Sequence, residues 1–217
     1  RDRSHDADLL LDLHCDFEAV MHLYVEQPMI EQIAPLARYL GARALLWARG
    51  SGPLISFDEA LSGPWWRLQE HFKDRAPVPL ACASTTVELR SQTDVSDELA
   101  AQDAQAIMNY LCERGVLAGP ATALPAALCE PTPLSATDDM HAPHPGVVVF
   151  HRHPGDVVKA GEVLAHIVDP VNRRRTPITT RTDGVIYARH NLRWATTGME
   201  VCLSHIHISE PTRPLYI

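Results

Sequence analysis

The chain has 217 residues, of which 46% are hydrophobic, and it carries a formal net charge of −8 at pH 7. This length supplies enough apolar surface for one medium domain or two small ones. The negative charge argues against nucleic acid and anionic membranes as partners, because both would repel the chain.

Cellular location is suggested by what the sequence lacks. No apolar run approaches the roughly 20 residues that span a bilayer, and no signal-peptide pattern opens the sequence. The five cysteines are odd in number, scattered and without a CxxC pair. This pattern is typical of reduced thiols rather than of a disulfide framework or a thiolate zinc site. We therefore expect a cytoplasmic protein.

The first predicted elements are two strands and a helix. An apolar run at 7–13, bounded by aspartates, predicts a strand buried on both faces in a parallel sheet. Residues 20–25 alternate as a second strand, which places His22 and Tyr24 on the face opposite to its apolar side chains. Residues 29–40 show helical spacing and end at a glycine.

Further alternation of strands and helices follows, which predicts an α/β layered sheet with sites at strand ends. The expected elements are a strand at 44–47, a loop at 50–64, a helix at 65–73, a strand at 79–89 and a helix at 97–114. Ser96 is the expected N-cap of the last helix, and Gly115 is its stop. Its expected apolar face consists of Ala100, Ala104, Ile107 and Leu111.

The composition changes near residue 119. Residues 119–132 are proline-rich and aperiodic, which predicts a linker between a first domain at 1–118 and a small all-β module at 133–203. Residues 204–217 follow no periodic pattern and resemble a translated sequencing adapter, so we expect a non-native tail that packs on nothing specific. His205 and His207 are accordingly discounted as ligands.

His14 is the first candidate functional residue. It lies at the end of the first strand, where α/β sheets place ligands. A neutral imidazole there could bind zinc, with Asp12 or Asp16 fixing its tautomer. The alternative is a histidine that only makes a hydrogen bond in a turn.

Glu88 is the second candidate, at the end of the strand at 79–89. A carboxylate in this place can take a proton from water and return it to a leaving group. The alternative is a structural pair with Arg90 or another cation. His22 could line the same pocket or simply pack, and Arg90 could bind an acidic substrate or form an ordinary ion pair.

These motifs resemble a known family. LDLHCDFEAVMHLY together with TTVELRSQTDVSDE is similar to the succinylglutamate desuccinylase/aspartoacylase family, relatives of zinc carboxypeptidases. The resemblance implies a three-layer α/β/α domain, with His14 as the third Zn²⁺ ligand and Glu88 as general base. It also implies a hydrolase that releases an acyl group from an N-acyl amino acid or similar small amide. His14 and Glu88 would then end neighbouring parallel strands and open into one cleft, within about 12 Å of each other.

One departure from the family pattern is clear. The resemblance places the first two zinc ligands in an HxxE motif upstream, together with an arginine that stabilises the oxyanion. No HxxE occurs upstream of His14. We therefore expect a truncated catalytic domain that by itself is inactive and binds zinc poorly.

The β module resembles the barrel-sandwich hybrid of biotinyl and lipoyl carriers. Such carriers present a lysine on a hairpin, but the corresponding DPVNRRRTP contains none, and Lys159 lies in another turn. We expect the module to cap the mouth of the active site instead. A non-enzymatic carrier or binding protein and a carboxypeptidase-like peptidase are the alternative functions. The acyl group, the amine and the oligomeric state, a homo-oligomer included, stay open.

Overall fold

The computed structural model describes residue 4 and the ranges 6–50, 55–120 and 122–206. Within these ranges no helix is long and apolar enough to cross a membrane.

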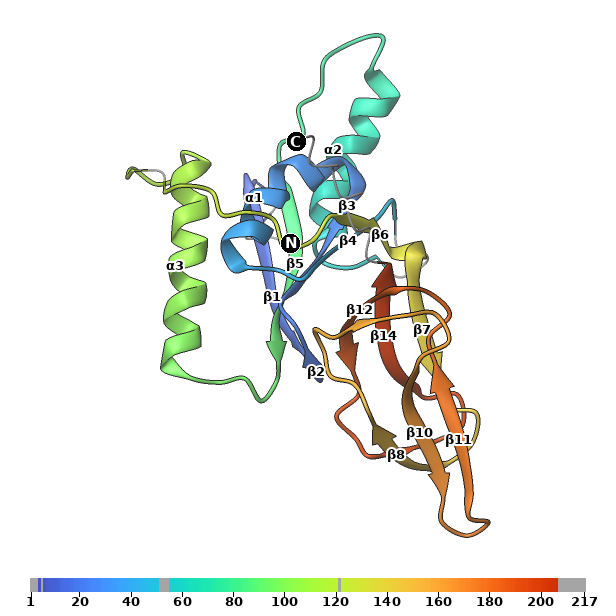
Figure 1. The fold of residues 1–217 in the computed structure, drawn as a ribbon. Helices are drawn as coiled ribbons and strands as arrows, with labels where there is room; N and C mark the ends of the chain where they lie inside the picture. Colours follow the sequence, from blue (N-terminus) through green and yellow to red (C-terminus); the bar gives the residue numbers. More distant parts are fainter. Residues whose placement is uncertain (1–3, 5, 51–54, 121, 207–217) are drawn as a thin grey trace, which may run out of the picture.

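The first part of the chain forms a mixed five-stranded sheet (Figure 1). Its order is β1 (Leu9–Asp16), β5 (Ala83–Ser91), β3 (His22–Glu26), β4 (Ala44–Ala48) and β6 (Pro131–Pro133). The pairs β1–β5, β3–β4 and β4–β6 are parallel, whereas β3 and β5 run antiparallel. The start of β3 therefore lies beside the end of β5, which brings three strand ends to one edge of the sheet.

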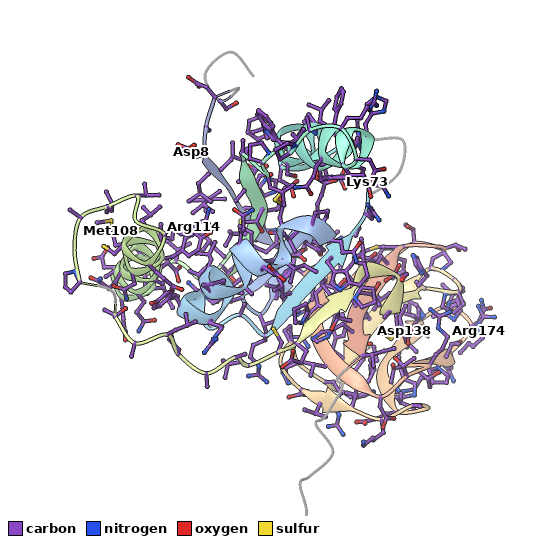
Figure 2. The ribbon with its side chains drawn as sticks, turned by 90° about the horizontal axis from the view of Figure 1, so that it is seen from above. Asp8, Lys73, Met108, Arg114, Asp138 and Arg174 are labelled. Atoms are coloured by element: carbon purple, nitrogen blue, oxygen red, sulfur yellow. The ribbon has the colours of Figure 1, made fainter. Side chains whose placement is uncertain are left out.

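Helices cover both faces of this sheet. A short 3-10 helix (Gln27–Met29) leads into α1 (Ile30–Leu40), which ends as predicted at Gly41 with φ 68°. On the same face α1 packs against α3 (Asp97–Glu113), where the Ser96 hydroxyl accepts the predicted cap bond from Leu99 N. On the opposite face lies α2 (Glu59–Phe72), which ends before Lys73, away from the Met108 and Arg114 side of the sheet (Figure 2).

Two predicted boundaries are wrong. Helix α2 begins at Glu59 rather than at 65 and continues through Gly63 and Pro64. Buried Ser62 donates a hydrogen bond to Glu26, so packing outweighs the weak helix propensity of this segment. Strand β5 begins at Ala83 rather than at 79, and it extends past 89 to Ser91.

The predicted apolar face of α3 is wrong in part, since Ile107 packs against the core but the two alanines do not. Ala100 and Ala104 are exposed, while Ala106 and Tyr110 are buried. The Tyr110 hydroxyl donates to the backbone oxygen of Gln32, which fixes this side of α3 against the start of α1. Alanine is equally compatible with either environment, so periodicity in an alanine-rich helix locates its buried face poorly.

Strand β1 is less buried than predicted. Its residues are half-buried or exposed, and Leu13 keeps 51% of its surface accessible. Among the described residues only β5 pairs with β1, so β1 is an edge strand rather than a strand buried on both faces.

The second part of the chain consists of two β-sheets around one core. The orders are β11-β10-β8-β13 and β2-β12-β14-β7, with β9 paired to β12. The second part begins with the 3-10 helix Leu134–Ala136. Its strands, in chain order, are β7 (Thr137–His141), β8 (Gly146–Phe150), β9 (Val157–Val158), β10 (Val163–Asp169), β11 (Arg174–Thr179), β12 (Gly184–Arg189), β13 (Trp194–Ala195) and β14 (Glu200–Ile206). Both sheets are open, and the barrel-sandwich description stays a prediction.

Two short strands pair outside the segment of the chain in which the sequence placed them. Strand β2 (Glu18–Ala19) comes from the first part but pairs with β12, and β6 comes from the expected linker but pairs with β4. The two parts therefore share backbone hydrogen bonds where β2 pairs with β12. Figure 1 shows β2 extending from the first part toward the β module. The domain limits at 118, 132 and 203 stay predictions.

The prediction that 204–217 packs on nothing specific is wrong for its first three residues. Strand β14 runs to Ile206 and pairs with both β12 and β7. Ser204 and His205 are buried, and His205 Nε2 lies 3.1 Å from the backbone oxygen of Arg43. Residues 207–217, and with them His207, lie outside the described residues.

Candidate active site

His14 and Glu88 lie side by side at the ends of β1 and β5. They are direct register partners in the parallel pair, and His14 Nδ1 is 3.9 Å from Glu88 Oε1. Both line a cavity of about 270 Å³. The expected shared cleft is thus confirmed, while the catalytic and metal-binding roles of the two residues stay predictions.

The surroundings of Glu88 favour a proton on its carboxyl group. Burial raises the pKa of Glu88, the nearby Asp16 carboxylate raises it further, and His14 opposes this shift. Glu88 Oε2 is buried without a hydrogen-bond partner. A carboxylate with increased proton affinity beside a cavity is suited to general-base chemistry.

His14 has the neighbours expected of an oriented imidazole. Its side chain is half exposed, and Nε2 lies 3.3 Å from Asp12 Oδ2. However, within the described ranges no three His, Cys, Asp or Glu side chains come together in a group that could hold a metal ion. The residues present here do not make a complete zinc site, so a ligand role for His14 requires other donors.

His22 is the register partner of Glu88 on its other side. It is fully buried, and its Nδ1 lies 2.8 Å from Val20 O. Burial lowers the pKa of His22. His22 is not among the residues that line the cavity, whereas Tyr24 is. The geometry therefore supports the packing interpretation of His22 more than a substrate contact.

Arg90 is held by α3. Its guanidinium makes two hydrogen bonds to Asp103 of α3, at 3.1 and 2.5 Å, and its φ is 65°. Arg90 does not line the His14–Glu88 cavity. Arg90 thus forms its ion pair with Asp103 rather than with Glu88. This geometry does not support a contact between Arg90 and a substrate.

Sequence reasoning missed a set of acidic side chains in the cavity wall. These are Glu26, Asp58 and Glu59, all buried. The alternation of the second strand, extended by one residue, places Glu26 on the same face as His22 and Tyr24 and would have found it. Asp58 and Glu59 fell in a segment predicted to be a loop. Leu134, from the second part of the chain, also lines the cavity.

Comparisons with known proteins agree with this geometry at the level of the fold. No protein-family model and no curated protein matches the chain. Among solved structures, two proteins assigned to succinylglutamate desuccinylase/aspartoacylase, from Shewanella frigidimarina NCIMB 400 and Shewanella amazonensis SB2B, are each 26% identical with a TM-score of 0.80. Each match covers 94% of this chain and 55% of the neighbour, so the chain spans about half the length of these proteins.

A more distant neighbour has the same fold. It is the ectoine utilization protein EutE (DoeB) from Ruegeria pomeroyi, with 17% identity and a TM-score of 0.70, over 92% of this chain and 58% of that protein. The mixed α/β structure of this chain therefore matches the fold of the succinylglutamate desuccinylase/aspartoacylase family.

Proposed function

We propose that the chain is part of a deacylase that hydrolyses the amide bond of an N-acyl amino acid or a similar small amide. The observation that carries this proposal is the His14–Glu88 register pair in one cavity, in a chain with the fold named above.

Glu88 is the residue proposed to move the proton. Its carboxylate accepts a proton from the attacking water and returns it to the amine as the amide bond breaks. The raised pKa of Glu88, caused by burial and the Asp16 carboxylate, strengthens it as a base. The proposal places the scissile carbonyl beside His14, whose Nδ1 lies 3.9 Å from Glu88 Oε1.

Substrate size follows from the cavity. A space of about 270 Å³ suits a small amide better than a peptide, which disfavours the carboxypeptidase-like alternative. Leu134 from the second part lines this space, as expected if the β module narrows the entrance. The carrier alternative has less support, because the β10–β11 hairpin has no lysine and Lys159 pairs with Asp183 at 2.8 Å.

Zinc belongs to the proposal only in part. The family resemblance implies a zinc ion at His14, yet the described side chains do not supply a ligand set for it. The proposed proton transfer therefore depends only on Glu88 and its surroundings in the cavity.

An activity assay tests the proposal. The chain, preceded by a segment that carries an HxxE motif, is assayed for amine release from N-acetyl and N-succinyl amino acids and diamines. We expect hydrolysis that Glu88→Gln lowers about 10³-fold and that Glu98→Gln, an exposed control on α3, leaves unchanged. Absence of hydrolysis, or full activity in Glu88→Gln, would reject the deacylase.

A further inference from the structure

The cavity that His14 and Glu88 line is also lined by acidic side chains that the catalytic proposal does not use. Glu26, at the end of β3, is 1% exposed, and Asp58 and Glu59 at the start of α2 are 3% and 6% exposed. Burial raises the pKa of both Glu26 and Asp58, and the neighbouring Glu59 raises both further. These carboxylates destabilise one another.

Glu26 is incompletely satisfied within the protein. Its Oε2 accepts a hydrogen bond from the Ser62 hydroxyl at 2.5 Å, but its Oε1 is buried with no hydrogen-bond partner. A buried carboxylate oxygen without a partner costs more free energy than a paired one, unless a ligand supplies the donor. Because Glu26 lines the cavity, such a donor can reach it there.

The cationic side chains of the described residues lie outside the lining of this cavity. The described residues that line the cavity include neither lysine nor arginine. The nearby Trp66 indole and the charge of Arg67 lower the pKa of Glu26, but the Arg67 guanidinium lies over the Trp66 ring at 5.2 Å, outside the cavity lining. A divalent metal does not fit either, since no three acidic side chains of the described ranges form a metal-holding group.

We propose that this cavity selects an N-acylated amine that carries a second, cationic group, with its ammonium or guanidinium against Glu26 and its acyl carbonyl near His14 and Glu88. The proposal rests on the deacylase function proposed above and names its substrate class. An acylated diamine or basic amino acid has this arrangement, whereas an acidic N-acyl amino acid would meet like charge.

The spacing fits an alkyl chain between the two groups. Glu26 lies four residues along β3 from His22, the register partner of Glu88. At about 3.3 Å for each residue, this separates the two ends by roughly 13 Å along the strand, less the reach of the side chains. Leu46, Ala48 and Leu134 line the cavity and supply apolar contacts for methylene groups.

Three probes with the same spacer test the proposal by calorimetric binding to the chain, in EDTA. They are N-acetylcadaverine, neutral N-hexylacetamide and anionic N-acetyl-aminocaproate. We expect N-acetylcadaverine to bind at least about 10-fold more tightly than the neutral probe, as one charge-assisted hydrogen bond allows, and the anion to bind most weakly. Equal affinities for the three probes, or tightest binding of the anion, would overturn the proposal. This measurement needs only the wild-type chain.

Variants assign the preference to Glu26. Glu26→Gln keeps the shape and the Ser62 contact, and we expect it to reduce the preference to about two-fold or less, while the exposed control Glu31→Gln retains it. A purely structural Glu26 would change the melting temperature without changing this ratio, which would reject the proposal.

Failure of the deacylase function would look different. Cation-selective binding without hydrolysis in the HxxE-supplemented chain would reject the deacylase and leave the Glu26 site standing. Faster hydrolysis of N-acetyl-aminocaproate than of N-acetylcadaverine would reject the cation-selective Glu26 site and support the deacylase.

Discussion

Glu88 lies between two histidines in one row across the sheet. His14 of β1 and His22 of β3 are its register partners on either side, so their side chains point to one face. His22 Nε2 and Glu88 Oε2 are both buried without a hydrogen-bond partner, although His22 Nε2 lies 4.0 Å from Asp16 Oδ2. Glu88 and His22 are therefore poorly solvated, and burial is the main cause of the raised pKa of Glu88 and the lowered pKa of His22.

The raised pKa of Glu88 has a measurable consequence. Because burial and then the Asp16 carboxylate raise it above 4.5, we expect Glu88 to become protonated at a higher pH than an ordinary glutamate as the pH falls. Asp16→Asn removes a repelling charge and should move the transition to lower pH. Carboxyl carbon NMR of the labelled chain measures both. An unchanged Glu88 titration in Asp16→Asn, or the same shift in the exposed control Asp74→Asn, would contradict this account.

Zinc binding tests the ligand role predicted for His14. One imidazole cannot hold zinc tightly, so we expect no tight, stoichiometric binding in a calorimetric zinc titration of this chain. In the HxxE-supplemented chain we expect tight binding that His14→Ala weakens at least about 10-fold and that Glu88→Ala spares. Tight binding by the present chain that survives His14→Ala would place the metal site elsewhere.

At the scale of elements, the short strand β2 joins the two parts of the molecule. Its backbone pairs with β12, and its Glu18 carboxylate accepts hydrogen bonds from Arg189 at 2.5 Å and Arg193 at 2.6 Å. Burial alone would raise the pKa of Glu18, but the bonds from the two arginines outweigh it and lower the pKa. This cluster is a charged link between β2 and the β module.

Removing the charge of Glu18 should weaken that link. We expect Glu18→Gln to lower the free energy of unfolding by about 1–2 kcal/mol near pH 7, less than the roughly 1.5–3 kcal/mol of hydrogen bonds to charged groups because the half-exposed Arg193 is screened by solvent. Since the folded pKa lies below 4.5, this stabilisation is present above pH 4.5 and disappears as the pH falls through the folded pKa. Urea unfolding at several pH values measures it. Equal stability of Glu18→Gln and wild type at pH 7, or an equal loss in Glu31→Gln, would speak against the link.

At the scale of the whole molecule, strand β14 completes the second part and contacts the first. It lies between β12 and β7, and His205 reaches the backbone of Arg43 in the turn before β4. The last residues of β14 therefore contact a segment of the first part that is distant in the sequence. Figure 1 shows β14 within the β module, below the first sheet.

Two shortened chains measure this contribution. A chain ending at Leu203 lacks the buried Ser204 and His205, whereas a chain ending at Ile206 keeps all of β14. We expect the shorter chain to be less stable by about 3 kcal/mol, because several backbone hydrogen bonds and buried contacts are lost. Thermal and urea unfolding compare the two chains. Equal stability would mean that 204–206 contribute nothing to the fold.

Much of the local structure was predictable from the sequence. The helices ending at Gly41 and beginning after Ser96 follow from helical spacing and capping, and the strands that carry His14 and Glu88 near their ends follow from runs of strand-forming residues. Each of these signals depends only on residues a few positions apart, so it can be read without knowing the fold.

The tertiary structure alone decided how these pieces combine. The antiparallel pairing of β3, the exposure of β1, the burial of Tyr110 rather than Ala104, and the acidic wall at Glu26 all depend on partners distant in the sequence. Strand pairing, burial and proton affinity are properties of contacts between such partners, and intrinsic propensity is too weak to determine them. For this reason the sequence identified the two residues that meet at the strand ends, while only the folded chain revealed the charged cavity that they share.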